Sequence, residues 1–569
     1  MQKSEPDSRT TEPGSGVDTL SSQEENAPEQ KNDEQPRLTG LPLYALLISM
    51  LLLIFIVILD ISIVSTAIPR ITDEFHTIAD IGWYGSAYLI SQCSVQPLSG
   101  RIFSFFPFKA SFLIFFGVFE LGSLICGVAQ SSKMLVVGRA ICGIGSAGLT
   151  NAILTIIGVA SPPGKKAMYM GILMSISSCG QIIGPLIGGA LTEHVSWRWC
   201  FYINLPVGAL TSFGFLFTPF PDVRDKKADR SIKSIFMGID IPGFLQFAPS
   251  CVMLLLALEW GGTKYAWKSA TIIGLLCGAV VLFVIFALWE RRHGDLAMIP
   301  PSLVGNRAVF SSCITSLFNG SGMIILSYYL PIYFQATKNA SPTSSGVYML
   351  PSFISQVLLS ITTGGSMRKI GYALLPLLLG SALVSTSYGL LSTLKINSGA
   401  GEWIGYQIIA GAGRGMALQM PILVVQSSVA KPKISTGTAM VLWSQFFGMA
   451  LFLSVAQTVF VHVLKTALHE YAPSLDATVV SNAGATGFAS VVPPEYHKAV
   501  ERAYAKGVAN TFYLGLALSL GAFISSFGTG TLKVDMAQLK DGVKPKGDAA
   551  KDTKTEEDAG QEGNSSMSS

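Results

Sequence analysis

The chain has 569 residues, of which half are hydrophobic and only 13% are charged, and its formal net charge is +4. A soluble globular domain carries about 25% charged residues, so this composition excludes that class and predicts a membrane protein. Polar and charged residues gather at 1–40 and 529–569, which we expect to be disordered tails. Residues 1–40 contain no apolar run after a basic start, so no cleavable signal peptide is expected.

About fourteen apolar segments are long enough to cross a bilayer as helices, each crossing requiring about twenty apolar residues. The first six cover 46–67, 81–98, 110–129, 134–157, 168–191 and 200–220. Two more, at 241–258 and 272–289, follow a basic linker at 221–239. The last six cover 310–334, 347–363, 372–394, 403–425, 437–461 and 510–527. The sequence therefore predicts an all-α polytopic membrane protein with about 14 transmembrane helices.

The loops between these segments alternate in basic charge. Loops after even-numbered segments are rich in Lys and Arg, among them Lys165 and Lys166, whereas the other loops carry fewer basic residues. Basic loops stay in the cytoplasm, so we expect these loops, both tails and both termini on that side. The connection at 462–509 would then be a long extracellular loop, and Asn339, in an Asn-Ala-Ser sequon, a glycosylation candidate.

A weak internal repeat relates the two ends of the hydrophobic region. Gly143-Ile144-Gly145 follows Arg139 in the fourth segment, and Gly411-Ala412-Gly413 precedes Arg414 in the twelfth, an offset of 411 − 143 = 268 residues. The repeat predicts two six-helix halves in parallel relation, at 41–220 and 309–528, with a helix pair inserted at 240–290. Rocking transporters build a central cavity from such halves.

Four charged residues lie inside the predicted spans: Asp60, Glu120, Arg139 and Arg414. Each costs at least about 2.5 kcal/mol at mid-membrane, so such residues usually face a cavity or a partner. The helical rise places the first three at similar depths below one surface. A carboxylate that alternates between water and a nearby arginine suits proton coupling, so Asp60, Arg139 and Glu120 are coupling candidates. The alternative is a permanent Asp60 to Arg139 bridge that only holds helices together, and a structural role is as plausible for Arg414.

Glycines recur every four residues in the fifth segment, at Gly180, Gly184 and Gly188. They form a smooth stripe on which another helix can pack closely. Pro185 removes a backbone hydrogen bond within the stripe, which Gly189 extends, and it is expected to kink the helix. The combination predicts a hinge or a seal between the two halves, although small-residue packing alone would be structural.

Polar residues within the spans are candidates for the wall of a solute cavity, which is otherwise expected to be apolar. Each of them could equally form a hydrogen bond between helices. The scarcity of further buried charge favours a lipophilic or amphipathic solute over a strongly ionic one. The candidates are Gln92, Asn151, Gln181, Asn319, Gln419 and Gln445.

Several other site classes are disfavoured. The eight cysteines lie in apolar runs without CxxC spacing and the six histidines are scattered, so no metal site is expected. The GxGxxG pattern at 143–148 lies inside an apolar span, not at a strand-to-helix turn, which disfavours a dinucleotide site. We find no enzyme constellation and no nucleotide-binding domain. We therefore expect no cofactor, no nucleic-acid partner and an ion gradient as the energy source.

Five segments together resemble the fourteen-span drug:proton antiporters of the major facilitator superfamily, as found in fungal toxin and multidrug efflux pumps. They are the first-span motif at 59–69, Gly138-Arg139 with the glycines that follow, GxxxGPxxGG at 180–189, and the blocks at 197–206 and 328–335. The resemblance implies proton-coupled export of a secondary metabolite, mycotoxin or drug by alternating access. It also implies a role for Arg139 in proton transfer, a plasma-membrane location, or alternatively a vacuolar or vesicle membrane, and a monomer.

The cytoplasmic loop motif of that superfamily, GxxxDRxGRR, is degenerate here. Only Gly100 and Lys109 remain, with Ser104 and Phe105 in place of its aspartate and arginine, which weakens the expectation of a charged gating network. Two other functions stay open. The same fold could import a siderophore or nutrient, and a membrane enzyme or a non-transporting sensor is the remaining alternative.

Overall fold

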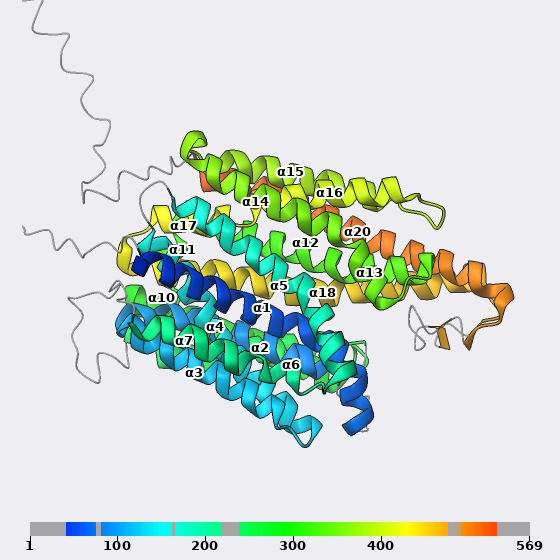
Figure 1. Ribbon diagram of the computed structural model, residues 1–569, viewed down its shortest axis with the longest axis horizontal. Helices are drawn as coiled ribbons and strands as arrows, with labels where there is room; N and C mark the ends of the chain where they lie inside the picture. The colour runs from blue at the N-terminus through cyan, green and yellow to red at the C-terminus, as the bar shows by residue number, and fades with distance from the viewer. Residues whose placement is uncertain are drawn as a thin grey trace, which may run out of the picture. The chain divides into compact units, whose positions relative to one another are not determined.

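The computed structural model of the protein describes residues 41–75, 81–161, 165–217, 238–262, 264–475, 479–480, 488 and 491–531. The predicted tail at 1–40 lies outside these residues, as do 532–569 of the predicted tail at 529–569 and 221–237 of the predicted linker at 221–239. The described part of the chain is almost entirely helical and contains no extended strand, as the sequence predicts (Figure 1). The remaining described segments are short connections between helices.

The helices before the linker are α1 (Leu41–Phe75), α2 (Ile81–Phe105), α3 (Phe108–Gly127), α4 (Ser132–Ala160), α5 (Lys166–His194), α6 (Trp199–Tyr202) and α7 (Asn204–Phe217). The inserted pair is α9 (Ile241–Trp260) and α10 (Ala270–His293). The helices after it are α11 (Pro301–Val304), α12 (Arg307–Lys338), α13 (Pro342–Tyr348), α14 (Leu350–Ile370), α15 (Leu374–Leu391), α16 (Ala400–Ala417), α17 (Met420–Ser428), α18 (Ile434–Tyr471) and α20 (His497–Ser526).

Polar residues at the helix ends determine where several helices begin and stop. Asp240 accepts a hydrogen bond from the Gly243 amide, 3.0 Å away, at the start of α9, and Asn306 does the same for the first turn of α12. At the other end, α14 stops at Gly371, whose φ of 73° is a left-handed conformation that glycine adopts without strain. Such caps satisfy backbone groups that have no partner within the helix.

The helices form two groups of close neighbours. Helix α4 lies against α2 and α3, and α1 lies against α5 and α7, around one large apolar core. Helix α12 lies against α18 and α20, and α16 lies against α14 and α15, around a second core. The groups meet where α5 contacts α14 and where α2 contacts α18, and α9 covers α2 beside its partner α10. We call α1–α7 the N half and α12–α20 the C half.

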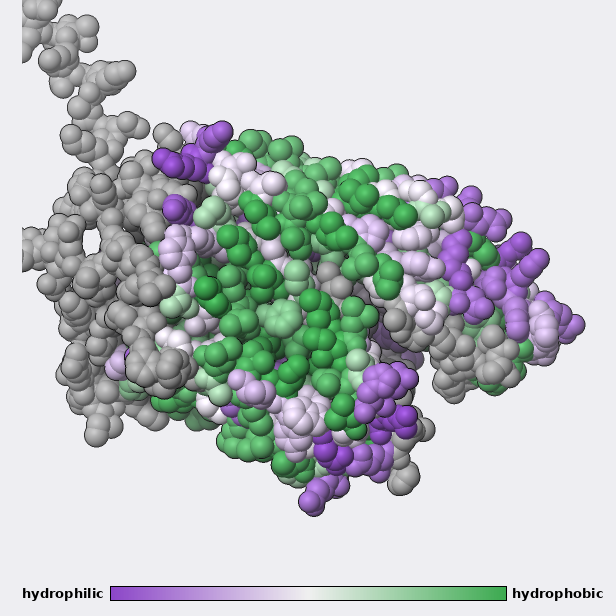
Figure 2. Space-filling model, viewed as in Figure 1, coloured by the Kyte–Doolittle hydropathy of each residue, from purple (hydrophilic) through white to green (hydrophobic). Residues whose placement is uncertain are grey.

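The ends of the helices gather on two sides of the bundle, which we name side A and side B. Helix α1 begins on side A, where α2 and α4 end and α5 and α18 begin, and α1 ends on side B (Figure 1). On the face shown in Figure 2, hydrophobic side chains cover much of the length of the helices, and hydrophilic ones gather at their ends. Leu358 and Leu375 are among the exposed apolar residues, as expected for a surface in contact with lipid.

Among the described residues, 11 helices are long and apolar enough to cross a membrane by length and composition. Helices α2, α7 and α14, which occupy three further predicted spans, do not meet those limits, although they pack within the bundle. The count of fourteen is therefore compatible with the structure and stays a prediction.

The predicted long loop at 462–509 is shorter in the structure. Helix α18 continues to Tyr471 and α20 already begins at His497. Both extensions have an apolar face: Leu468 of α18 and Val500 of α20 are fully buried. The prediction was wrong at both boundaries, because packing of buried residues extends these helices beyond their apolar spans. A criterion of about twenty apolar residues identifies only the span that crosses the membrane.

Candidate transport site

Asp60 of α1 and Arg139 of α4 form a buried ion pair. The Oδ2 atom of Asp60 lies 2.6 Å from Nη1 of Arg139, and the two side chains are 0% and 1% exposed. The pair lies toward side B, since Arg139 is in the second turn of α4. The sequence placed both residues at similar depth, and the structure brings them into contact.

Three further groups complete the surroundings of the pair. Asn204 of α7 donates from Nδ2 to Oδ1 of Asp60 and to Oγ of Ser123, each at 3.0 Å. The Nε atom of Arg139 donates to the Tyr84 carbonyl at 2.9 Å, and the guanidinium lies 4.6 Å from the centre of the Tyr88 ring. The carboxylate therefore has one charged and one neutral donor, which a buried charge needs.

Asn204 was not predicted as a site residue. It lies in the block at 197–206, which carried the family resemblance but was assigned no chemistry. The detectable signal was a lone amide side chain at the start of an apolar helix, and sequence alone does not show that α7 turns it toward Asp60.

Glu120 lies near this pair without joining it. It is half-buried on α3, one helical turn before Ser123, and both of its carboxyl oxygens are buried without a hydrogen-bond partner. A Cβ atom at Gly208 would overlap its Oε1, so the glycine leaves the space that the carboxyl group fills.

The glycine stripe of α5 packs against α1 of its own half. The Gly180 carbonyl accepts a hydrogen bond of 3.2 Å from Ser62, and Cβ atoms at Gly184 and Gly188 would overlap Ser62 and Thr66. The expectation that these glycines seal one half against the other is therefore wrong, because the stripe faces α1. Pro185 is inside the helix, and a hinge at that position stays a prediction.

Another face of α5 does contact the C half. Ser360 of α14 donates to the Gly171 carbonyl at 3.2 Å, and Gln356 donates to Oγ of Ser178 at 2.8 Å. A Cβ at Gly364 would lie 2.5 Å from the Ala167 carbonyl, so the two helices touch there through their backbones. These contacts involve the first half of α5: those of Ala167 and Gly171 lie toward side A, and that of Ser178 lies nearer the middle of the bundle.

A second contact between the halves joins α2 and α4 to α17 and α18. Asn151 of α4 donates to Oγ of Ser99 and of Ser435, each at 3.2 Å. Gln426 donates to the Leu154 carbonyl at 3.0 Å. Together with the contacts of Ala167 and Gly171 with α14, these hydrogen bonds join the halves on side A in this structure.

The predicted cavity candidates fall into two groups. Asn151 takes part in the contact just described, and Gln419 donates to the Ser360 carbonyl at 3.3 Å, so both form bonds between helices. The other four are half-buried or buried: Gln92, Gln181 and Asn319 each have a buried amide atom without a partner, and the Gln445 backbone lies against Gly320.

The degenerate loop motif has a hydroxyl contact in place of charges. Ser104 donates to the Pro432 carbonyl at 3.1 Å, and a Cβ at Gly100 would lie 2.8 Å from Cα of Thr436. Lys109 is half-buried at the start of α3. Arg101, which the sequence did not single out, binds the segments that flank the inserted pair: it donates to the carbonyls of Gly238, before α9, and Leu296, after α10, at 3.1 and 2.6 Å.

Asn339 is the exposed C-cap of α12, with a left-handed φ of 50°. Its position on side B is accessible, and its glycosylation stays a prediction.

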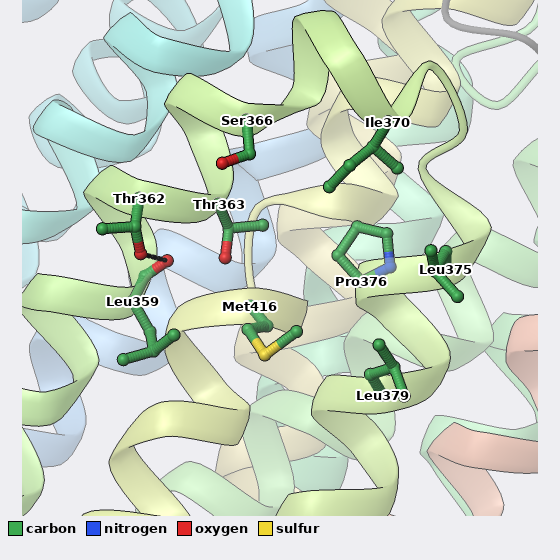
Figure 3. A pocket seen from close by; sticks show the side chains of 9 residues that line it. All are labelled: Leu359, Thr362, Thr363, Ser366, Ile370, Leu375, Pro376, Leu379 and Met416. Carbon is green, nitrogen blue, oxygen red and sulfur yellow. Dashed lines mark hydrogen bonds between the residues drawn. The ribbon is translucent and has the colours of Figure 1, made fainter.

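An apolar groove on the C half is separate from all of these residues. It has a volume of about 220 Å³ and is lined by α14, α15 and α16, with Thr362, Leu375 and Met416 among its walls (Figure 3). It contains none of the predicted site residues and is open to the outer surface, where lipid would lie, so we assign no solute to it.

Comparison with known proteins places the chain in a family. The model of the Major Facilitator Superfamily matches residues 50–455. "Efflux pump mlcE" of Penicillium citrinum is 44% identical over 516 residues, which cover 89% of this chain and 93% of that protein. "MFS-type efflux pump MFS1" of Trichophyton rubrum is 41% identical over 519 residues, which cover 91% of this chain and 97% of that protein.

A solved structure shares the fold. The proton:xylose symporter XylE bound to 6-bromo-6-deoxy-D-glucose has a TM-score of 0.56 and 12% identity, and the match covers 88% of this chain and 99% of that chain. At that identity the likeness concerns the fold alone. The chain belongs to the major facilitator superfamily, and it is a multi-pass membrane transporter of small molecules, not an enzyme.

Proposed function

We propose that the protein exports a lipophilic or amphipathic small molecule, such as a secondary metabolite, mycotoxin or drug, in exchange for protons, and that Asp60 carries the proton. The observation that carries this proposal is the buried pair of Asp60 and Arg139. The direction of transport is supported by the names of the relatives, several of which are called efflux pumps. No bound cofactor takes part, and the proton gradient supplies the energy.

The surroundings of Asp60 suit a carboxyl group that gains and loses a proton. The charged form is held by Arg139 and Asn204. Protonation removes the negative charge and weakens the attraction of Asp60 for Arg139. The guanidinium then retains the Tyr84 carbonyl and the Tyr88 ring as partners, so it is not left bare. Arg139 and Glu120 are the proposed assisting groups, Glu120 as a second carboxyl near the pair.

Helix contacts connect Asp60 to the interface between the halves. Ser62, two residues further along α1, is bonded to α5 through the Gly180 carbonyl. Helix α5 in turn contacts α14 through Gly171, toward side A, and through Ser178, nearer the middle of the bundle. A shift of α1 that follows protonation would therefore move α5 against the C half, which is the motion that alternating access requires.

We further propose that side A faces the cytoplasm, so that both termini lie there and the structure is closed toward the cytoplasm. The basic loops after even-numbered spans support this orientation. A monomer in the plasma membrane would suffice, because one chain supplies both halves.

The test is release of fluorescent lipophilic solutes from an efflux-deficient yeast that expresses the chain, with and without a protonophore. Wild type should release at least one solute faster than cells without the chain, and the protonophore and Asp60→Asn should each abolish that gain. Glu74→Gln, which breaks an exposed pair with Arg198, is the matched control and should keep release. Wild-type release that ignores the proton gradient would refute coupling, and accumulation in place of release would indicate import.

A further inference from the structure

The C half contains a buried guanidinium without a counter-ion. Arg414 of α16 is 6% exposed, and its Nη2 atom donates to Oγ of Ser352. Its Nε and Nη1 atoms are buried without any hydrogen-bond partner. Within the part of the chain that the structure describes, the ion pairs are those of Arg139, Arg198, Lys433 and Lys506, and none includes Arg414.

The contrast with Arg139 is informative. The Arg139 guanidinium lies 2.6 Å from a carboxylate. Arg414 instead lines a cavity together with the neutral Asn319 of α12. An arginine without a counter-ion at membrane depth is unfavourable, and two N–H groups without acceptors make its burial more so. A purely structural arginine would be expected to use those groups, as Arg139 does.

The two residues that carry unpaired donors, Arg414 and Asn319, line one small cavity. Arg414 and Asn319 line a partly open cavity of about 10 Å³ between α12, α15, α16 and α20. The Nδ2 atom of Asn319 is also buried without a partner. The Tyr388 hydroxyl is already engaged with the Gly322 carbonyl, and the Ser519 hydroxyl donates to the Leu516 carbonyl at 2.9 Å. The unsatisfied groups at this cavity are therefore N–H donors on two residues.

The unpaired N–H groups of Arg414 and Asn319 require a hydrogen-bond acceptor. A negatively charged acceptor would also compensate the positive charge of the guanidinium. The cavity has room for about one water-sized group, so it admits a head-group oxygen but not the body of a solute. Phe318, Met323 and Leu418 are among the other residues that line it.

We propose that Arg414 and Asn319 form an anion-binding subsite that takes the carboxylate, or a comparable acidic oxygen, of the exported compound. This inference rests on the proposed function and narrows its substrate class to amphipathic acids. It also replaces the expectation from sequence that the solute carries no strong charge. In the N half the protein supplies both charges of the pair, and in the C half the solute supplies the negative one.

The first experiment measures small-anion binding through the thermal stability of the purified protein in lipid nanodiscs. Acetate represents the carboxylate head, acetamide is its neutral match, and chloride represents an inorganic anion, with a bulky sulfonate balancing ionic strength. Acetate should raise the Tm of wild type and acetamide should not. Arg414→Gln should weaken the acetate response by about tenfold or more in concentration, and Arg414→Lys should restore part of it.

A second variant lets the subsite be tested even if Arg414→Gln does not fold. Asn319→Ala leaves the guanidinium in place and should still weaken the acetate response, by about threefold. If the Tm of wild type and of both variants responds equally to acetate, the subsite does not exist. A response to chloride alone would assign the site to a resident inorganic anion and would overturn the assignment to the solute.

Transport then separates this inference from the proposed function. In the yeast assay, each amphipathic acid is paired with its primary amide. Arg414→Gln should lose release of the acids while release of amides persists, whereas Asp60→Asn should lose both yet keep the acetate response. Release of acids by Arg414→Gln at the wild-type rate would refute the subsite. If the wild type responds to acetate but shows no proton-dependent release, only the proposed coupling is refuted.

Discussion

Ser62 of α1 donates a hydrogen bond of 3.2 Å to the Gly180 carbonyl of α5. This bond joins the helix that carries Asp60 to the helix that contacts the C half. The glycines at 184 and 188 allow the two backbones to approach, because any side chain there would overlap α1. Close approach of α1 and α5 is thus a condition for the proposed route from proton binding to movement of the halves.

Enlarging Gly188 should force these helices apart. A Cβ there would lie 2.6 Å from the Ile63 carbonyl, which is backbone and cannot rotate away. We expect Gly188→Val to cost about 1–3 kcal/mol of stability and to reduce solute release strongly. Gly189→Val is the matched control, because a Cβ at Gly189 meets nothing within 4 Å. The measurements are the Tm of the purified protein and release in yeast; equal behaviour of the two variants would contradict the packing argument.

Removing both charges of the buried pair should separate stability from transport. Arg139→Leu leaves Asp60 buried without its counter-ion and should destabilise the protein by roughly 3–5 kcal/mol. The double variant Asp60→Asn with Arg139→Leu removes the unpaired charge and should recover most of that loss, but it should not release solute in response to a proton gradient. A double variant that regains proton-driven release would mean that the pair only holds α1 and α4 together.

Joining the halves covalently on side A should stop transport reversibly. The hydroxyl oxygens of Ser104 and Thr436 lie 3.3 Å apart, which is compatible with a disulfide between cysteines at these positions. Oxidation of Ser104→Cys with Thr436→Cys should abolish release, and a reductant should restore it. Ser104→Cys alone should remain active under oxidant. Full release by the cross-linked protein would show that the halves need not separate here.

The partly exposed pair of Glu74 and Arg198 at the side B end of α1 should give a small pH-dependent contribution to stability. Hydrogen bonds from Arg198 and from the Trp197 indole hold the pKa of Glu74 below its usual value of 4.5. Its contribution is therefore present above about pH 4.5 and is lost as the pH falls through the lowered pKa. Glu74→Gln should reduce stability at pH 7 by less than about 1 kcal/mol, and the difference in Tm from wild type should shrink on acidification. A constant difference would contradict the assignment.

The sequence alone determined the class and the helical character of the chain, and it predicted the depth of the charged residues. Composition and the lengths of the apolar runs follow directly from the bilayer, and the rise per residue placed Asp60 and Arg139 at similar levels. The motifs at 59–69 and 180–189 then indicated the superfamily, which the comparisons confirm.

The tertiary structure alone decided which side chains meet. Helical rise fixes how deep a residue lies but not which neighbour it faces, since that depends on the rotation and packing of each helix. The partners of Asp60 therefore include Asn204, which lies 144 residues away in the chain, and the glycine stripe faces α1 instead of the C half. For the same reason, sequence could not show that Arg414 lacks the carboxylate that Arg139 has: pairing of buried charges is a property of the packed bundle.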